Sequence, residues 1–131
     1  MDRLFLDANV LFSAAYRDQS GLARLWKVKR VKLLSSAYAV EEARRNLTEA
    51  AQRGRLARLV KMVEIIDVVS ALSSEPGLPA KDEPILRAVV AARATHLLTG
   101  DVRHFGAFLG TRLEGALVLL PGEYLRGRSG R

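Results

Sequence analysis

Five short apolar runs, separated by segments of helical character, constrain the fold of this chain more than any other feature. Each run is apolar throughout instead of alternating with polar residues, which is the pattern of a strand buried on both faces. Strands of this kind that alternate with helices form a parallel sheet covered by helices on both sides. The sequence therefore predicts an α/β fold with strands at residues 3–6, 31–34, 65–69, 96–99 and 116–120.

Helix signals follow the first two predicted strands. Asn9 is a suitable N-cap for a helix after the first strand. Ser35 or Ser36 is suitable for the next long helix, which the apolar spacing extends to about Gln52. Gly54 then interrupts the helical pattern.

Length and composition predict one globular domain over residues 1–125, followed by a flexible basic tail at 126–131. The chain has 131 residues, of which 49% are hydrophobic and 27% charged. It contains no Cys and only 2 His, which excludes thiolate metal sites and disfavours a histidine-rich zinc site. A net charge of +7 and a pI near 10.4 favour polyanionic partners. No signal peptide or membrane span is recognisable in the sequence, so a cytoplasmic protein is expected.

Acidic residues are scarce in this basic chain, yet several stand where predicted strands meet helices. In parallel α/β sheets, sites form beyond the carboxyl ends of the strands. Asp7 and Asp101 each follow a strand directly, so the two carboxylates can meet in one crevice. Helix phase favours Glu42 over its neighbour Glu41 as an acid that faces this crevice. Asp82 precedes a predicted helix and is the remaining candidate.

Each of these acids also has an ordinary structural explanation. Asp7 can charge or cap the start of a helix, and Asp82 before Pro84 is common helix-start chemistry. Asp101 in Thr99-Gly100-Asp101 can form an Asx turn. Several carboxylates close together repel one another, and a divalent cation removes that cost. Mg²⁺ and Mn²⁺ prefer oxygen ligands and also bind phosphate, as metal-assisted phosphodiester hydrolysis requires.

The order of these motifs resembles the PIN-domain family of metal-dependent ribonucleases. The resemblance rests on segments 4–11, 35–43 and 81–86 and on 96–105, and it extends over roughly residues 3 to 120. It implies a three-layer α/β/α fold with a mainly parallel sheet of about four to five strands, and often a homodimer. It also implies an endoribonuclease that uses Mg²⁺ or Mn²⁺. The acids that match the family's metal-binding and catalytic positions are Asp7, Glu42, Asp82 and Asp101.

Supporting roles and partners follow from the same comparison. Asn9 matches the small polar residue that supports the first acid, and Thr99 can fix the rotamer of a neighbouring carboxylate. Many small members are VapC-type toxins that a small antitoxin silences, so an antitoxin is a candidate partner beside the RNA substrate. The opening motif Asp7-Ala8-Asn9 differs from that of the strict toxins and leaves the toxin role open. The last segment lacks an extra acid that some family members have, so the number of metal ions, one or two, also stays open. The residues predicted to contact the RNA backbone are Lys27, Lys29, Arg30 and Arg103.

Two other functions compete with this interpretation. A haloacid-dehalogenase-like phosphatase uses the Asp after the first strand as a nucleophile, but it needs a second Asp two residues later, where this chain has Asn9. A PIN scaffold that binds RNA without cleaving it is the non-enzymatic alternative. The presence of all the candidate acids favours the enzyme. His104, close to Asp101, suggests a general acid, but a turn histidine that supports the packing of Phe105 is the better explanation.

Overall fold

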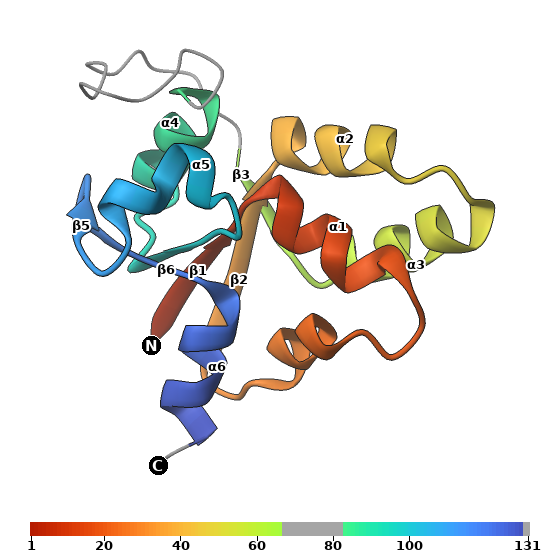
Figure 1. Ribbon diagram of the computed structural model, residues 1–131, viewed down its shortest axis with the longest axis horizontal. Helices are drawn as coiled ribbons and strands as arrows, with labels where there is room; N and C mark the ends of the chain where they lie inside the picture. The colour runs from red at the N-terminus through yellow and green to blue at the C-terminus, as the bar shows by residue number, and fades with distance from the viewer. Residues whose placement is uncertain (67–82, 130–131) are drawn as a thin grey trace.

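A computed structural model of the chain describes residues 1–66 and 83–129. Its centre is a six-stranded sheet in the order β3-β2-β1-β4-β6-β5 (Figure 1). All neighbouring strands are parallel except the pair β5–β6. This confirms the predicted α/β class with a mainly parallel sheet. The strands are β1 (Asp2–Leu6), β2 (Val31–Ser36), β3 (Glu64–Ile66), β4 (His96–Leu98), β5 (Arg112–Leu113) and β6 (Ala116–Leu119).

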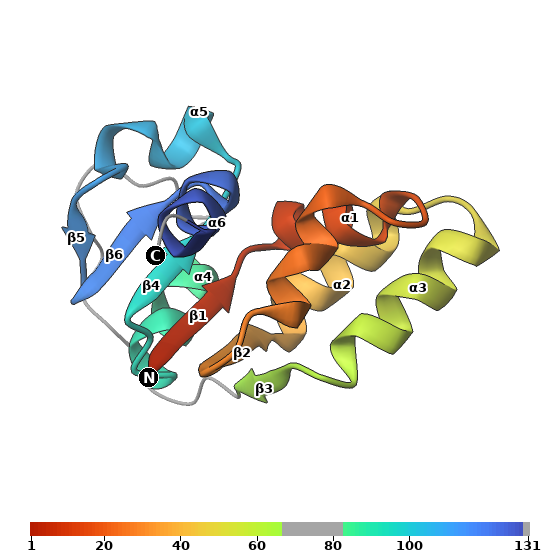
Figure 2. The same ribbon diagram turned by 90° about the horizontal axis from the view of Figure 1, so that it is seen from below.

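Helices occupy most of the chain between the strands. In Figure 2, α1, α2 and α3 are grouped together on the β2–β3 side of the sheet. None of the helices among the described residues is both long and apolar enough to span a membrane. The helical elements are α1 (Ala8–Tyr16), the 3₁₀ helix η1 (Gly21–Lys27), α2 (Ala37–Asn46), α3 (Ala50–Val60), α4 (Glu83–Ala91), α5 (Val102–Phe105), the 3₁₀ helix η3 (Gly106–Phe108) and α6 (Pro121–Ser129).

The core lies along the central strands, which are as apolar as the sequence predicted. Leu4, Phe5 and Leu6 in β1 are fully buried, and so are Leu97 and Leu98 in β4. The register aligns Leu6 with Leu98 at the carboxyl ends of these two neighbouring strands. The residues that follow the two strands therefore start from the same edge of the sheet.

The long helix predicted from Ser35 or Ser36 to Gln52 is two helices. Ser36 does cap the first of them, because its side chain accepts a hydrogen bond from the backbone N–H of Ala39 at 3.1 Å. This helix ends at Leu47, which adopts an extended conformation while its side chain stays buried. Gln52 then stabilises the start of α3 by accepting a hydrogen bond from the Glu49 N–H. Gly54 lies inside α3 and does not interrupt it.

The carboxyl-terminal segment begins as a helix. Helix α6 extends from Pro121 through Ser129 and so includes the start of the segment 126–131, whose flexibility stays a prediction. Pro121 is compatible with a first helical turn, and the Glu123 side chain accepts a hydrogen bond from the Leu120 N–H at 3.0 Å. Tyr124 and Leu125 are buried against the core, which holds the helix in place.

His96, at the start of β4, gives the fold an expected pH dependence. Burial lowers the pKa of His96; the nearby Asp2 carboxylate opposes this shift and Arg112 adds to it. Below about pH 6.5 the unfolded state therefore takes up a proton on this imidazole before the folded state does. Stability should fall as the pH drops through this region. We expect His96→Gln to show a smaller loss of unfolding free energy between pH 7 and pH 5.5 in urea titrations, and an unchanged loss would contradict this explanation.

Candidate active site at the carboxyl ends of the strands

Asp7 is the first residue after β1 and forms the N-cap of α1. Its backbone N–H donates to the carbonyl of Leu98 at 3.1 Å, which ties it to the end of β4. Its Oδ1 accepts from the Ala8 N–H at 2.8 Å. The residue is only 6% exposed, so a carboxylate is held almost out of solvent at the edge of the sheet. Asp7, and not Asn9, is therefore the helix cap, contrary to the sequence prediction.

Thr99 is the first residue after β4 and joins two of the candidate acids through one hydroxyl. The Thr99 Oγ1 donates to Asp7 Oδ2 at 2.8 Å. The same oxygen accepts from the backbone N–H of Asp101 at 3.0 Å. Thr99 is fully buried, so solvent does not compete for these hydrogen bonds. The Asp7 carboxylate and the backbone of Asp101 are consequently fixed relative to each other.

Asn9 forms a second link between α1 and the turn after β4. Its Oδ1 accepts from the Gly100 N–H at 2.7 Å, and its Nδ2 donates to Asp7 Oδ2 at 3.3 Å. A Cβ on Gly100 would lie 3.3 Å from the Asn9 Oδ1, closer than most Cβ contacts. The glycine therefore permits the approach on which this link depends. The Asn9 amide therefore contacts the Asp7 carboxylate and bridges α1 and the turn after β4.

Asp101 caps the short helix α5, and its Oδ1 accepts from the His104 N–H at 3.2 Å. Its Oδ2 lies 2.7 Å from the His104 Nδ1. The Asp101 side chain is 26% exposed, in contrast to the buried Asp7. His104 thus contacts the carboxylate of a candidate site residue, which the sequence could only suggest from its spacing.

Glu41 and Glu42 have different surroundings on α2. Glu41 is exposed and forms an ion pair with Arg44, which lowers the pKa of Glu41. Glu42 is half-buried and lines a pocket of about 380 Å³. Asn9, which donates a hydrogen bond to Asp7, lines the same pocket. Glu42 therefore lies on the side of α2 that faces Asn9, whereas Glu41 faces solvent. The other residues that line this pocket are Ala8, Phe12 and Asn46.

The remaining predicted residues are not all close to Asp7. Asp82 lies outside the described residues. Within residues 1–66 and 83–129, no three His, Cys, Asp or Glu side chains form a group that could hold a metal ion. Lys29 and Arg30 precede β2 and lie at the amino ends of the strands, at the opposite edge of the sheet from Asp7, and Lys27 ends η1 shortly before them. Arg103 is exposed on α5, two residues after Asp101.

The sequence of this chain matches a known protein family. A family model described as PIN domain matches residues 3–103, which include Asp7, Glu42, Thr99 and Asp101. The chain belongs to the PIN-domain family. Proteins of this family are generally nucleases and generally use divalent metal ions. No curated protein matches the chain.

One solved structure shows that a chain with very different side chains adopts the same PIN fold. It is the crystal structure of VapBC2 from Rickettsia felis bound to a DNA fragment from their promoter. The TM-score is 0.59 at 14% sequence identity, and the match covers 88% of this chain and 96% of that chain. At this identity the likeness is one of fold.

The donor groups of this PIN domain suit a hard divalent cation. The side-chain oxygens gathered here are the Asp7 carboxylate, the Asn9 amide and the Thr99 hydroxyl, and the Asp101 backbone is bound to the same hydroxyl. Oxygen is the donor that Mg²⁺ and Mn²⁺ prefer. A carboxylate that is nearly excluded from water, as Asp7 is, also gains most from a positive charge beside it.

Proposed function

We propose that this PIN domain is a metal-dependent endoribonuclease whose site is built on Asp7, Glu42, Asp82 and Asp101. The observation that carries the proposal is the link between Asp7 and Asp101 through the Thr99 hydroxyl at the ends of two adjacent parallel strands. Membership of a family of nucleases supports the reaction class. The net charge of +7 supports a polyanionic substrate such as RNA.

In this proposal Asp7 and Asp101 hold Mg²⁺ or Mn²⁺, with Glu42 and Asp82 completing the acidic set. The bound ion would supply an activated water and charge stabilisation at the scissile phosphate. The chain's own contribution is orientation. Thr99 fixes one oxygen of Asp7, the Ala8 N–H fixes the other, and Asn9 ties α1 to the turn that presents Asp101. These contacts hold the Asp7 carboxylate in one orientation relative to the turn that carries Asp101.

Removal of divalent metal tests this proposal. We expect EDTA to abolish cleavage of a fluorescently labelled single-stranded RNA and added Mn²⁺ to restore it, with product lengths that show internal cuts. Far-UV circular dichroism in EDTA should remain that of the folded chain, because the described core does not depend on a metal. Cleavage that persists in EDTA would contradict the assignment of a metal site.

We further propose that the enzyme acts in the cytoplasm as the toxin of a toxin–antitoxin pair. The fold likeness to VapBC2 supports this role, and the homodimer implied by the family resemblance belongs to the same proposal. We expect expression of the chain alone to arrest growth, and a small protein encoded beside it to co-purify and relieve the arrest. Harmless overexpression of an active enzyme would instead indicate an RNA-processing role.

The two competing functions are affected differently by these findings. Membership of the PIN family removes the reason for a haloacid-dehalogenase-like phosphatase. A PIN scaffold that binds RNA without cleaving it remains the alternative to the enzyme. It predicts RNA binding that is equal in EDTA and Mn²⁺, together with no products in either condition.

A further inference from the structure

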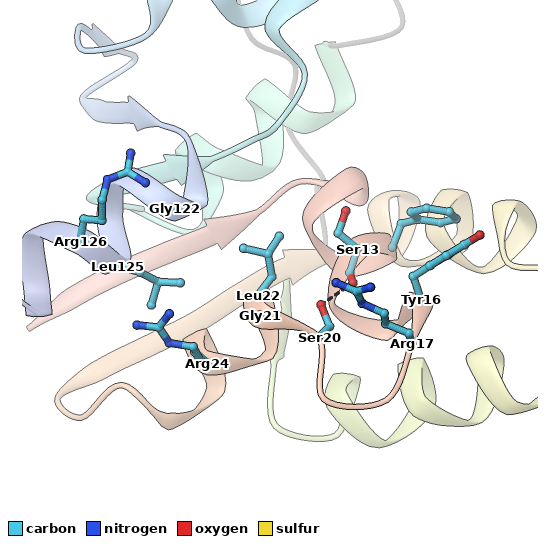
Figure 3. A pocket seen from close by; sticks show the side chains of 11 residues that line it. Ser13, Tyr16, Arg17, Ser20, Gly21, Leu22, Arg24, Gly122, Leu125 and Arg126 are labelled. Carbon is cyan, nitrogen blue, oxygen red and sulfur yellow. Dashed lines mark hydrogen bonds between the residues drawn. The ribbon is translucent and has the colours of Figure 1, made fainter.

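A pocket of about 520 Å³ lies beside α1, on the side away from α2, and the proposed function does not use it. Its volume is in the range of pockets that bind small molecules or single groups of a larger ligand. We call it the arginine pocket. It is lined by Phe12, Ser13, Tyr16, Arg17, Ser20, Gly21, Leu22, Arg24, Gly122, Leu125 and Arg126, from α1, η1, α6 and the segment between α1 and η1 (Figure 3).

The charge of the arginine pocket is of one sign. Arg17, Arg24 and Arg126 line it and are all exposed, and none of its described lining residues is acidic. Glu123, the nearest acid in sequence on α6, accepts a hydrogen bond from Leu120 at the start of its own helix. Guanidinium groups around a concave surface favour an anionic ligand, above all a phosphate or carboxylate.

The arginine pocket also contains an aromatic pair. The rings of Phe12 and Tyr16 lie 5.3 Å apart between centroids and are tilted by 40°. Tyr16 is 53% exposed, so part of its ring is accessible for stacking on a planar group. Figure 3 shows Tyr16 and Arg17 at one end of the pocket and Arg24 and Arg126 at the other, with Leu22 between them.

Phe12 connects the arginine pocket with the candidate active site. It lines this pocket and also the pocket that contains Asn9 and Glu42. A ligand in the arginine pocket would therefore lie across one phenyl ring from the pocket of Asn9 and Glu42. A strand that crosses Phe12 can reach both places, which a free small anion cannot.

We propose, on the basis of the proposed function, that the arginine pocket binds the nucleotide segment of the RNA strand that flanks the scissile bond. Arg24 and Arg126 contact backbone phosphate, and a base stacks on Tyr16. Proteins that bind single-stranded nucleic acid without sequence preference combine positive charge with exposed aromatic rings. An acidic protein segment would use the arginines but would not need the exposed ring.

The test is the binding of a fluorescein-labelled single-stranded oligoribonucleotide, followed by polarisation in EDTA so that no cleavage occurs. We expect Arg24→Ala/Arg126→Ala to raise Kd about tenfold or more. The slope of log Kd against log salt should fall by about 1.4, from two lost phosphate contacts at about 0.7 each on a single strand. Tyr16→Leu should raise Kd about fivefold with an unchanged slope, because stacking is not ionic.

Arg45→Ala/Arg58→Ala is the matched control, because it removes the same charge from exposed sites on α2 and α3 that do not line the arginine pocket. If both double variants lose the same RNA affinity, the proposal is overturned, because only general electrostatic attraction between the basic chain and RNA is then needed. Oligoglutamate binding that depends on Arg24 and Arg126, with RNA binding that does not, would overturn it in favour of an acidic protein partner. If the unchanged chain binds and cleaves RNA while the pocket variants behave as wild type, the pocket assignment fails and the nuclease stands. If the unchanged chain neither binds nor cleaves RNA, the proposed function is wrong, and the pocket assignment that rests on it is wrong as well.

Discussion

Asp7→Asn should abolish Mn²⁺-dependent cleavage of single-stranded RNA while the protein stays folded. We expect the rate to fall by at least about two to three orders of magnitude, as when an electrostatic group is removed from other active sites. The amide keeps an oxygen that can cap α1, since Asn is as good an N-cap as Asp. It loses the negative charge, and an amide NH₂ takes the place of Oδ2, the oxygen that accepts hydrogen bonds from Thr99 and Asn9. Initial cleavage rates and urea unfolding of the same preparations measure both effects.

Glu114→Gln is the control for this experiment, because Glu114 is an exposed acid in the turn between β5 and β6 and lines neither of the two pockets beside α1. It should cleave RNA at the wild-type rate and unfold at the same urea concentration. Asp101→Asn should behave like Asp7→Asn, because its side-chain oxygen can still accept the capping bond from the His104 N–H. Full activity in both Asp7→Asn and Asp101→Asn would refute the proposed site.

Thr99→Val should weaken both the fold and the metal site. The substitution keeps the shape of the side chain but removes the hydroxyl that serves Asp7 Oδ2 and the Asp101 N–H. Loss of a partner for buried polar groups costs about 1–3 kcal/mol of unfolding free energy. Loss of a group that orients a metal ligand lowers metal affinity by about 10–100-fold. Urea unfolding and titration with Mn²⁺, followed by the electron paramagnetic resonance of the free ion, give the two values.

Thr99→Ser separates these two effects. Serine retains the hydroxyl but loses a buried methyl group, which costs about 1 kcal/mol of stability. We therefore expect Thr99→Ser to bind Mn²⁺ nearly as tightly as wild type although it is less stable. Equal Mn²⁺ affinities in the Val and Ser variants would show that Thr99 supports only the fold.

The central strands could be predicted from the sequence because they contain apolar runs, such as the run from Leu4 to Leu6. Strand β5 could not, because it has only two residues and one of them is an arginine. The break between α2 and α3 could not, because Leu47 continues the apolar spacing while its backbone has already left the helix. Helix α6 was hidden for a related reason. Its Gly and Arg content is typical of a frayed end, whereas the burial of Tyr124 and Leu125 packs it against the core.

In the candidate site, too, local features could be predicted from the sequence and contacts between distant residues could not. The ordinary structural explanation for Asp7 is correct, because it does cap a helix. What the sequence could not give is the set of contacts that cross the chain. Thr99 is 92 residues from Asp7 and Gly100 is 91 residues from Asn9, and both pairs meet because β1 and β4 are neighbours.

The basic residues illustrate the limit most clearly. Lys27, Lys29 and Arg30 form a cluster in the sequence, but Lys29 and Arg30 stand at the amino ends of the strands, away from Asp7. Arg17, Arg24 and Arg126 are scattered along the chain and gather at one pocket next to α1. Folding brings α6 against η1, and no local pattern announces that contact.

A crystal soaked in Mn²⁺ and measured at the manganese absorption edge shows whether Asp7 and Asp101 bind one metal ion together. We expect an anomalous peak between Asp7 and Asp101, with carboxylate oxygens at about 2.1 Å from the ion, as is typical of small hard divalent cations. Data that show no peak near Asp7, or manganese only at unrelated surface carboxylates such as Asp18, would contradict it.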